Sequence, residues 1–160
     1  MKTEVTNKIR TVLYVIVCIA FLIGLCLSAA AENKAATDPT RIQVTIVDKT
    51  CRTEPDDWSY GTKYCIDYTY EIKNPTKSDW CALTIKTYVY DKNGTSLGTL
   101  TTDFGSSGSG EFRIRSGETM TKVAHFENSD PDAFYQQLYQ SDLENLTFES
   151  EVSYGTYIRK

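Results

Sequence analysis

Residues 83–100 read LTIKTYVYDKNGTSLGTL, and this stretch contains the clearest structural pattern of the chain. Apolar residues such as Ile85 alternate with polar or tyrosine positions, which is the period-two pattern of a strand with one buried face. The pair Asn93-Gly94 favours a hairpin turn, because both residues tolerate a positive φ. The stretch therefore predicts two antiparallel strands joined by a tight turn. Asp91 can cap that turn and has no catalytic partner assigned to it.

The same alternation recurs in other parts of the chain. A single helix is predicted over residues 129–146, where Ser129 or Asp130 would cap the N-terminus and Pro131 fits the first turn. Short strands with one helix predict an all-β, antiparallel sandwich of six or seven strands, with the helix near residues 130–143. The other strand candidates are residues 41–48, 64–74, 97–104, 111–115, 119–126 and 146–158.

The N-terminal 31 residues determine the expected compartment. A basic segment over residues 1–10 precedes an uncharged apolar run over residues 12–27, and small residues follow as far as Ala31. This order is typical of a signal peptide that is cleaved after Ala31. The run is also long enough to span a bilayer, so a retained membrane anchor is the second interpretation. In both cases residues 32–160 are expected outside the cytoplasm, because the positive flank stays inside.

Three parts of the chain are expected: residues 1–31 as signal peptide or anchor, 32–40 as a polar linker, and 41–160 as the sandwich domain. The protein would then be extracellular or at the cell surface. It would contact a membrane only through residues 12–31, if these are not removed. Lipid attachment is disfavoured, since neither Cys18 nor Cys26 follows a small residue.

Composition argues against a nucleic-acid partner. The chain has a net charge of −4 and a pI near 5.0. Nucleic-acid binding needs clustered Lys and Arg, and here the basic residues are scattered.

Three stretches resemble a known family, and they are YEIKNPTKSDW (70–80), LTIKTYVYDKNGTSLGTL (83–100) and IRSGETMTKVAHF (114–126). Together they resemble the FxLYD-type domain, an immunoglobulin- or fibronectin-III-like sandwich of exported bacterial proteins. The likeness spans about residues 63–127 and includes Tyr90-Asp91, whereas Thr87 and Val89 occupy the positions of Phe and Leu in the family name. The resemblance implies an immunoglobulin-like sandwich and export, and it implies no catalytic residues.

Three cysteines lie beyond the N-terminal segment. Cys51 follows the first predicted strand and Cys65 begins the second, so a hairpin would bring them together. Export permits a disulfide, and we expect one between Cys51 and Cys65, worth about 3 kcal/mol in the chain-entropy model. A bond between Cys65 and Cys81, or no bond at all, stays open.

Few residues suggest catalysis or metal binding. His125 is the only histidine, and a nucleophilic pair with Cys81 would need a third, orienting group. A zinc site of Cys51, Cys65, Cys81 and His125 lacks the closely spaced ligand pairs that such sites use. Asn128, Asp130 and Asp132 resemble the start of a calcium loop, but helix capping explains them better. We therefore expect no catalytic residues, no metal and no cofactor.

Aromatic residues offer the only indication of a binding surface. The candidates are Trp58, Tyr60, Trp80, Tyr88 and Tyr90. On a solvent-facing surface such rings suit the recognition of proteins or sugars, although cross-strand packing would explain them as well.

The expected function is that of an exported, non-catalytic module that binds a protein or a cell-envelope polymer. A structural spacer domain in an envelope assembly is the alternative, and a small extracellular enzyme is the weakest interpretation.

Overall fold

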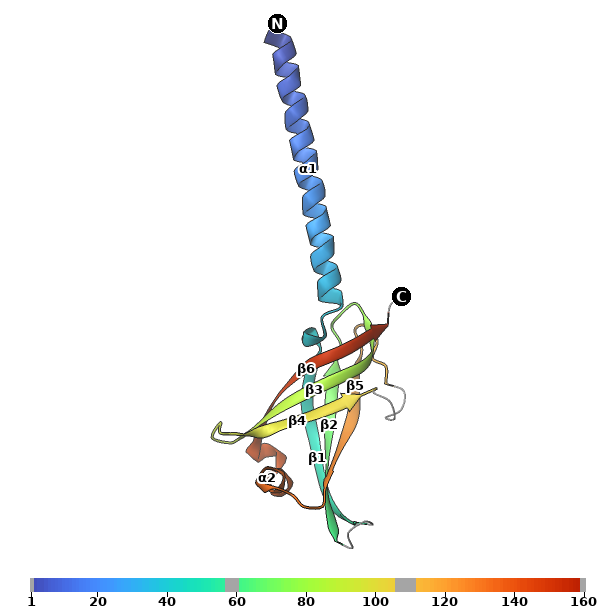
Figure 1. Cartoon of the computed structure of the whole chain (residues 1–160), viewed down its shortest axis with the longest axis vertical. Coiled ribbons are helices and arrows are strands. Elements are labelled where there is room, and N and C mark those ends of the chain that lie inside the picture. Colours follow the sequence, from blue (N-terminus) through green and yellow to red (C-terminus); the bar gives the residue numbers. More distant parts are fainter. Residues whose placement is uncertain (1, 57–60, 106–111, 159–160) are drawn as a thin grey trace. The chain divides into compact units, whose positions relative to one another are not determined.

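The computed structural model describes residues 2–56, 61–105 and 112–158, with the backbone alone described over residues 2–15 (Figure 1). The chain divides into two compact units, Met1–Thr37 and Asp38–Lys160.

The first unit is one helix, α1 (Lys2–Ala36). Its part Ile16–Ala36 has a mean hydropathy of 2.0, and by length and composition it could cross a membrane. Large apolar side chains such as Phe21 and Leu27 are exposed along it. A signal sequence has the same properties, so both predicted roles remain compatible with this helix. Residues 32–36, predicted as linker, are helical.

The second unit contains six antiparallel strands in two three-stranded sheets, counted over the described residues. In the first sheet β2 (Thr62–Lys73) lies between β1 (Gln43–Pro55) and β5 (Thr119–Asn128). In the second sheet β3 (Asp79–Asp91) lies between β4 (Ser96–Phe104) and β6 (Leu146–Ile158). The remaining elements are the 3₁₀ turns η1 (Pro39–Arg41) and η2 (Leu143–Asn145) and the helix α2 (Ala133–Gln140).

The mostly antiparallel β fold and the short helix near residues 130–143 are thus confirmed. The strand predicted over residues 146–158 has those bounds in the structure. The strand predicted over 111–115 is wrong for its described part, where Ile114 forms an isolated bridge with Trp80.

Both sheets contribute to one hydrophobic core. Inward-facing residues of the two central strands are fully buried, including Tyr68 and Ile72 on β2 and Ile85 and Val89 on β3. Alternate residues of a strand point to opposite faces, so the neighbours of these positions form the outer faces of the sheets. The outer faces therefore present mostly polar and charged side chains, with Val123 on β5 as an exposed apolar exception.

The β3–β4 turn forms as predicted. Gly94 has φ +82°, and its amide donates to the Asp91 carbonyl oxygen at 3.0 Å. The Asp91 carboxylate accepts hydrogen bonds from the amides of Asn93 and Thr95, both at 2.8 Å. These bonds, that from Thr95 foremost, lower the pKa of Asp91. Asp91 is therefore a turn residue.

A polar cluster, the Asn74 junction (Asn74, Thr76, Trp80 and Ser116), ties the end of β2 to the segment before β5. Its first three residues are buried, and the exposed Ser116 donates its hydroxyl to the Thr76 carbonyl oxygen at 2.7 Å. The Asn74 amide donates to the carbonyl oxygens of Ser78 (2.8 Å) and Arg115 (2.9 Å). Its oxygen accepts from the Thr76 hydroxyl at 2.7 Å, and that hydroxyl accepts from Trp80 Nε1 at 3.0 Å. Asn74 is fully buried, and the bonds that Thr76 makes with Asn74 and Trp80 are buried, whereas those to Ser78 and Arg115 are partly buried.

Helix α2 connects the first sheet to the second. Asp132 caps it by accepting from the Tyr135 amide at 2.8 Å, so the predicted caps Ser129 and Asp130 are wrong. The capping role predicted for this acidic segment nevertheless holds for Asp132. The Phe134 ring lies 2.8 Å from the position that a Cβ of Gly98 would occupy, so glycine permits this close packing against β4.

Candidate functional site

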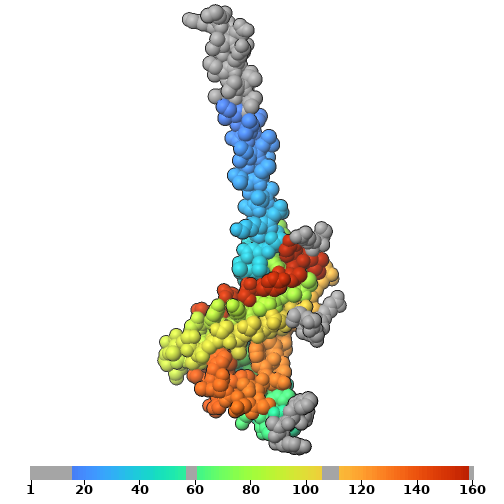
Figure 2. Space-filling view, viewed as in Figure 1, coloured from blue at the N-terminus to red at the C-terminus, as the bar shows by residue number. Residues whose placement is uncertain are grey.

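An open groove lies between β4 and β5, which are one edge strand of each sheet. Its volume is about 510 Å³, within the range of ligand-binding pockets. Figure 2 shows the yellow surface of β4 next to the orange surface of β5 and α2. The groove is lined by Thr101, Thr102, Asp103, Phe104, Gly105, Phe112, Lys122, Val123, Ala124, His125 and Phe126.

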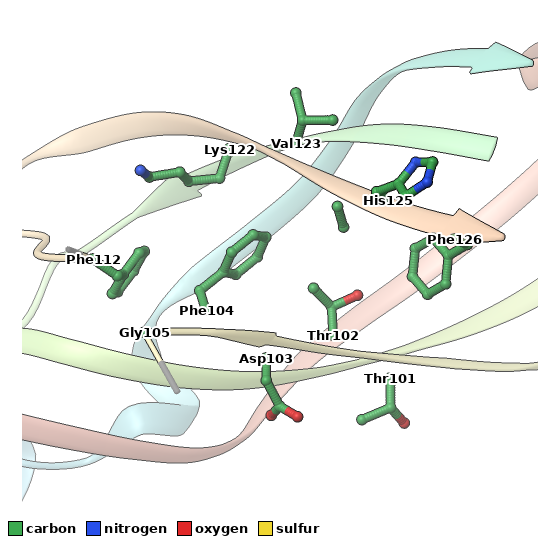
Figure 3. A pocket seen from close by; sticks show the side chains of 11 residues that line it. Thr101, Thr102, Asp103, Phe104, Gly105, Phe112, Lys122, Val123, His125 and Phe126 are labelled. Carbon is green, nitrogen blue, oxygen red and sulfur yellow. The ribbon is translucent and has the colours of Figure 1, made fainter. Parts of the chain in front are cut away.

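The walls of this β4–β5 groove combine aromatic and polar side chains (Figure 3). Phe104 and Phe112 are stacked, with ring centroids 5.8 Å apart. Lys122 and His125 come from β5, and Asp103 comes from β4. The Asp103 carboxylate already accepts from the Thr84 hydroxyl at 2.5 Å, so the groove offers an apolar floor with Lys122 beside it.

Thr102 is the unusual residue of the groove. It is 8% exposed, and its hydroxyl has no hydrogen-bond partner. A buried hydroxyl without a partner costs free energy of folding, about 1–3 kcal/mol in mutational studies. The hydroxyl oxygen itself is shielded from solvent, so a ligand in the groove would reach it only after the Thr102 side chain rotates.

The two groove strands also have unpaired edges. Over the described residues, β4 pairs only with β3 and β5 pairs only with β2. An edge strand presents backbone N–H and C=O groups to which another strand can add. The groove is therefore bordered by two such edges.

The tyrosine pair predicted from the sequence lies elsewhere, on the outer face of the second sheet. Tyr88 and Tyr90 are half-buried there, and their hydroxyls donate to Glu151 (2.8 Å) and Glu149 (3.3 Å). The hydrogen bond to Glu151 raises the pKa of Tyr88, and desolvation with the nearby Glu149 raises that of Tyr90. Both phenols already have partners on β6.

Trp80 was expected at an aromatic surface and is instead fully buried. Its ring packs edge-on against Tyr157, and its indole N–H belongs to the Asn74 junction. The prediction of Trp80 as a binding residue at the surface is therefore wrong, whereas Tyr88 and Tyr90 lie on an outer face. Trp58 and Tyr60 lie outside the described residues.

The predicted Cys51–Cys65 disulfide is not formed, because both thiols are free. Cys51 lies opposite Ile66, and Cys65 lies opposite Arg52. Adjacent positions in one register point to opposite faces, so Cys51 faces the interior, with its Sγ 3.5 Å from the Tyr139 carbonyl oxygen, and Cys65 faces outward. Cys81 is also free and lies in the other sheet.

The zinc set of three cysteines and His125 is excluded by the same geometry. Cys65 and His125 do lie together, however, with two residues that the sequence prediction missed. These four residues, Cys65, Asp67, His125 and Glu127, form the Cys65 cluster on the outer face of the first sheet. In the strand register Cys65 is opposite Glu127, and Asp67 is opposite His125. Alternation along β2 could have placed Cys65 and Asp67 on one face, and alternation along β5 could have done the same for His125 and Glu127. It could not have predicted that these two strands pair with each other.

Hydrogen bonds link the Cys65 cluster to its surroundings. His125 Nδ1 lies 2.6 Å from Asp67 Oδ1, and its Nε2 lies 3.3 Å from Glu127 Oε2. Lys63 donates to Glu127 at 3.1 Å, and Arg52 pairs with Asp67. Both carboxylates therefore have cationic partners.

These contacts shift the pKa values of the cluster. Burial acts to raise the pKa of Asp67, but hydrogen bonds from His125 and Arg52 outweigh it and the pKa is lowered. The bond from Lys63, followed by that from His125, lowers the pKa of Glu127. Burial, with a smaller effect of Glu54, raises the pKa of Cys65.

A second, smaller cavity of about 200 Å³ lies beside α2, lined by Tyr64, Pro131, Tyr135, Gln136, Tyr139 and Gln140. The Tyr135 hydroxyl donates toward the carbonyl oxygens of Tyr64 (2.8 Å) and Phe126 (2.9 Å). Burial raises the pKa of Tyr135 to about 12. Its hydroxyl is thus already bound to the protein.

No known family model matches this chain, and no curated protein matches it either. One similar solved structure is described as the X-ray structure of Northeast Structural Genomics Consortium target SoR45. It is 16% identical, with 58% of this chain and 67% of that chain covered and a TM-score of 0.37. Another is the putative ApaA protein from Bordetella pertussis, 17% identical, with 59% and 72% covered and a TM-score of 0.30. Likenesses this weak support no functional argument.

Proposed function

We propose that this protein is an exported, non-catalytic binding module that holds an extended segment of another protein in the β4–β5 groove. The proposal keeps the immunoglobulin-like sandwich implied by the FxLYD resemblance as its fold. It assigns α1 to export, as a signal peptide or as a retained anchor.

The observation that carries this proposal is the pairing of a groove with two unpaired strand edges. An extended peptide can add to a sheet edge through its backbone and place side chains into neighbouring pockets. Phe104 and Phe112 would contact apolar side chains of the peptide, and Lys122 would contact its polar groups. Rotation of the Thr102 side chain toward the peptide would give its hydroxyl the hydrogen bond that it lacks.

The shape of the groove also favours a peptide over a compact small molecule. The groove is open and follows two strands, and strand addition uses the length of such an edge. Tyr88 and Tyr90 are the less favourable site, because their hydroxyls are occupied by Glu151 and Glu149.

The test uses the full chain in detergent micelles and a library of random peptides displayed on phage. Peptides selected on the wild type are measured against Thr102→Val, which keeps the shape of the side chain and removes the hydroxyl. We expect binding to weaken by about tenfold, because the hydrogen bond to the peptide is lost. Folding stability should be equal or higher, because the unpartnered hydroxyl is removed.

The control changes the tyrosine face with Tyr88→Ser and Tyr90→Ser. Peptide binding should be unchanged in both. A different result would place the binding site on the tyrosine face. In that case the peptides would bind Thr102→Val and the wild type with equal affinity and would bind the tyrosine variants more weakly. Failure to select any peptide would contradict the proposal and favour the structural spacer.

A further inference from the structure

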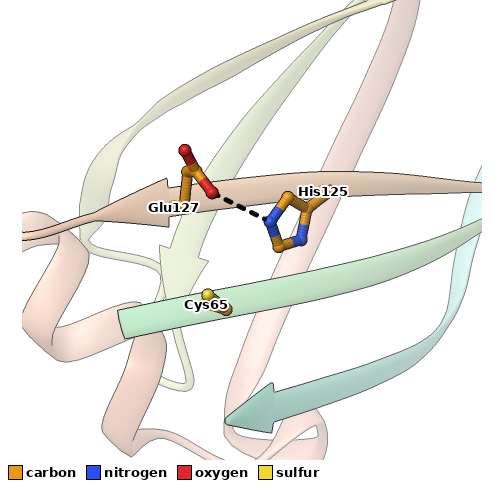
Figure 4. Close-up of side chains that lie close together, drawn as sticks. All are labelled: Cys65, His125 and Glu127. Carbon is orange, nitrogen blue, oxygen red and sulfur yellow. Dashed lines mark hydrogen bonds and ion pairs between the residues drawn. The ribbon is translucent and has the colours of Figure 1, made fainter. Parts of the chain in front are cut away.

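The Cys65 cluster has the layout of a metal site on the outer face of the first sheet. Ligand atoms of Cys65, His125 and Glu127 all lie within 4.8 Å of one another (Figure 4). They come from two hydrogen-bonded strands, so the sheet itself fixes their spacing. One ion could contact all three after small side-chain movements.

The ligand types select the class of metal. A thiolate, an imidazole and a carboxylate are together typical of zinc, which accepts sulfur, nitrogen and oxygen ligands in tetrahedral sites. Calcium and magnesium prefer oxygen ligands alone, and this set contains one such residue among the three. The chemistry therefore favours Zn²⁺.

Asp67 completes the arrangement from behind the histidine. Its carboxylate lies 2.6 Å from His125 Nδ1, the ring atom that does not face Glu127. A metal-binding histidine commonly donates its second N–H to a carboxylate, which sets the tautomer and turns the free nitrogen toward the metal. Here that free nitrogen would be Nε2, on the side of Glu127.

The thiol is placed to be a ligand and not a packing residue. Cys65 is 0% exposed although it lies on the outer face of the sheet, because charged side chains cover it. Among the described residues it makes no disulfide. A cation that reaches it must displace the Lys63 ammonium from Glu127, and lysine has a flexible stem that permits this.

We propose that Cys65 Sγ, His125 Nε2 and the Glu127 carboxylate bind one zinc-class divalent cation, with Asp67 as the residue that positions His125. Binding forms the Sγ–metal bond and releases the thiol proton to solvent. The fourth coordination position is left for water. This site is separate from the proposed peptide groove, although His125 also borders the groove.

The test is a titration of the full chain, purified in detergent without a histidine tag, with Co²⁺ as a spectroscopic substitute for Zn²⁺. We expect one equivalent of Co²⁺ to produce thiolate-to-cobalt charge-transfer absorption and visible d–d bands, which added Zn²⁺ then removes. The charge-transfer band should disappear in Cys65→Ser. It should persist in the matched variants Cys51→Ser and Cys81→Ser, and in the double variant Cys18→Ser/Cys26→Ser.

Three further variants separate ligation from mere ion pairing. Asp67→Asn should keep the spectrum and weaken Co²⁺ binding by about tenfold. Glu127→Gln should shift the d–d bands, because a ligand is changed. Lys63→Gln should bind Co²⁺ at least as tightly as the wild type, because the competing ammonium is gone. Circular dichroism verifies that each variant is folded.

Two results would overturn the metal site. One is the absence of a thiolate band in the folded wild type, and the other is a band that survives Cys65→Ser. The two proposals remain distinguishable, since Thr102→Val should leave Co²⁺ binding unchanged and Cys65→Ser should leave peptide binding unchanged.

Discussion

The two ends of β2 hold polar side chains in opposite ways. At the C-terminal end, Asn74 is fully buried and bonded to backbone carbonyl oxygens and to Thr76. Near the N-terminal end, Cys65 lies under charged side chains that pair with one another at an exposed face. The Asn74 junction is uncharged, whereas the Cys65 cluster consists of titratable groups.

This difference separates a structural role from a binding role. Every described bond of Asn74 goes to a partner that the fold keeps in place, so a change there leaves buried groups without partners. The partners of the Cys65 cluster are long side chains near solvent, which can exchange one cation for another at small cost. Stability should therefore depend on the junction, and ligand binding on the cluster.

The largest effect is expected for Asn74→Ala. The change removes the Asn74 side chain from the Thr76 amide and hydroxyl and from two backbone carbonyl groups. The Thr76 hydroxyl keeps its bond from Trp80, and the Arg115 carbonyl keeps that from the Glu118 amide. We expect the free energy of unfolding to fall by about 3 kcal/mol or more. Urea unfolding followed by near-UV circular dichroism measures this, with exposed Lys73→Ala as the neighbouring control. If the free energy of unfolding falls as little as in the Lys73→Ala control, the Asn74 junction does not have the proposed structural role.

Trp80→Phe should have the next largest effect. It deletes the indole N–H that bonds the Thr76 hydroxyl and leaves part of a fully buried volume empty. The expected loss is about 2 kcal/mol in the same urea experiment. A variant as stable as the wild type would show that the hydrogen bond at this end of β2 is dispensable.

Tyr135→Phe tests a buried hydroxyl outside both regions. Losing its bonds to the Tyr64 and Phe126 carbonyl oxygens should cost about 1 kcal/mol at neutral pH. The pKa of Tyr135 is about 12 in the folded protein and about 10 when unfolded. Its contribution is therefore present below pH 10 and lost as the pH rises toward 12. The wild type should lose stability more steeply over this range than the variant, and equal slopes would contradict the assignment.

The smallest effect on stability is expected at the Cys65 cluster. Lys63→Gln removes the ion pair with Glu127, whose side chain is half exposed. Such surface pairs contribute little, so the urea midpoint should match that of the wild type at low and high salt. A clear destabilisation would mean that the cluster is structural, and the contrast between the two ends of β2 would then disappear.

Local sequence patterns predicted the strands and the turn well, but they did not predict how the strands pair and which way their side chains face. The alternation over residues 146–158 and the Asn93-Gly94 turn both describe short-range geometry, and both are confirmed. The Cys51–Cys65 bond depended on relative facing, and it is wrong because of an irregularity in β1. The register shifts between Ile46 and Asp48, which reverses the facing of every later residue of the strand. No residue pattern in the sequence predicts that shift.

The sequence by itself determined where strands, turn and apolar helix lie, because period-two alternation, an Asn-Gly pair and a long uncharged run act within a few residues of one another. Only the tertiary structure decided that Trp80 is buried and that β4 and β5 border a groove. It alone brought Cys65 beside His125 and Glu127, some 60 positions along the chain, because the pairing of β2 with β5 is a long-range contact.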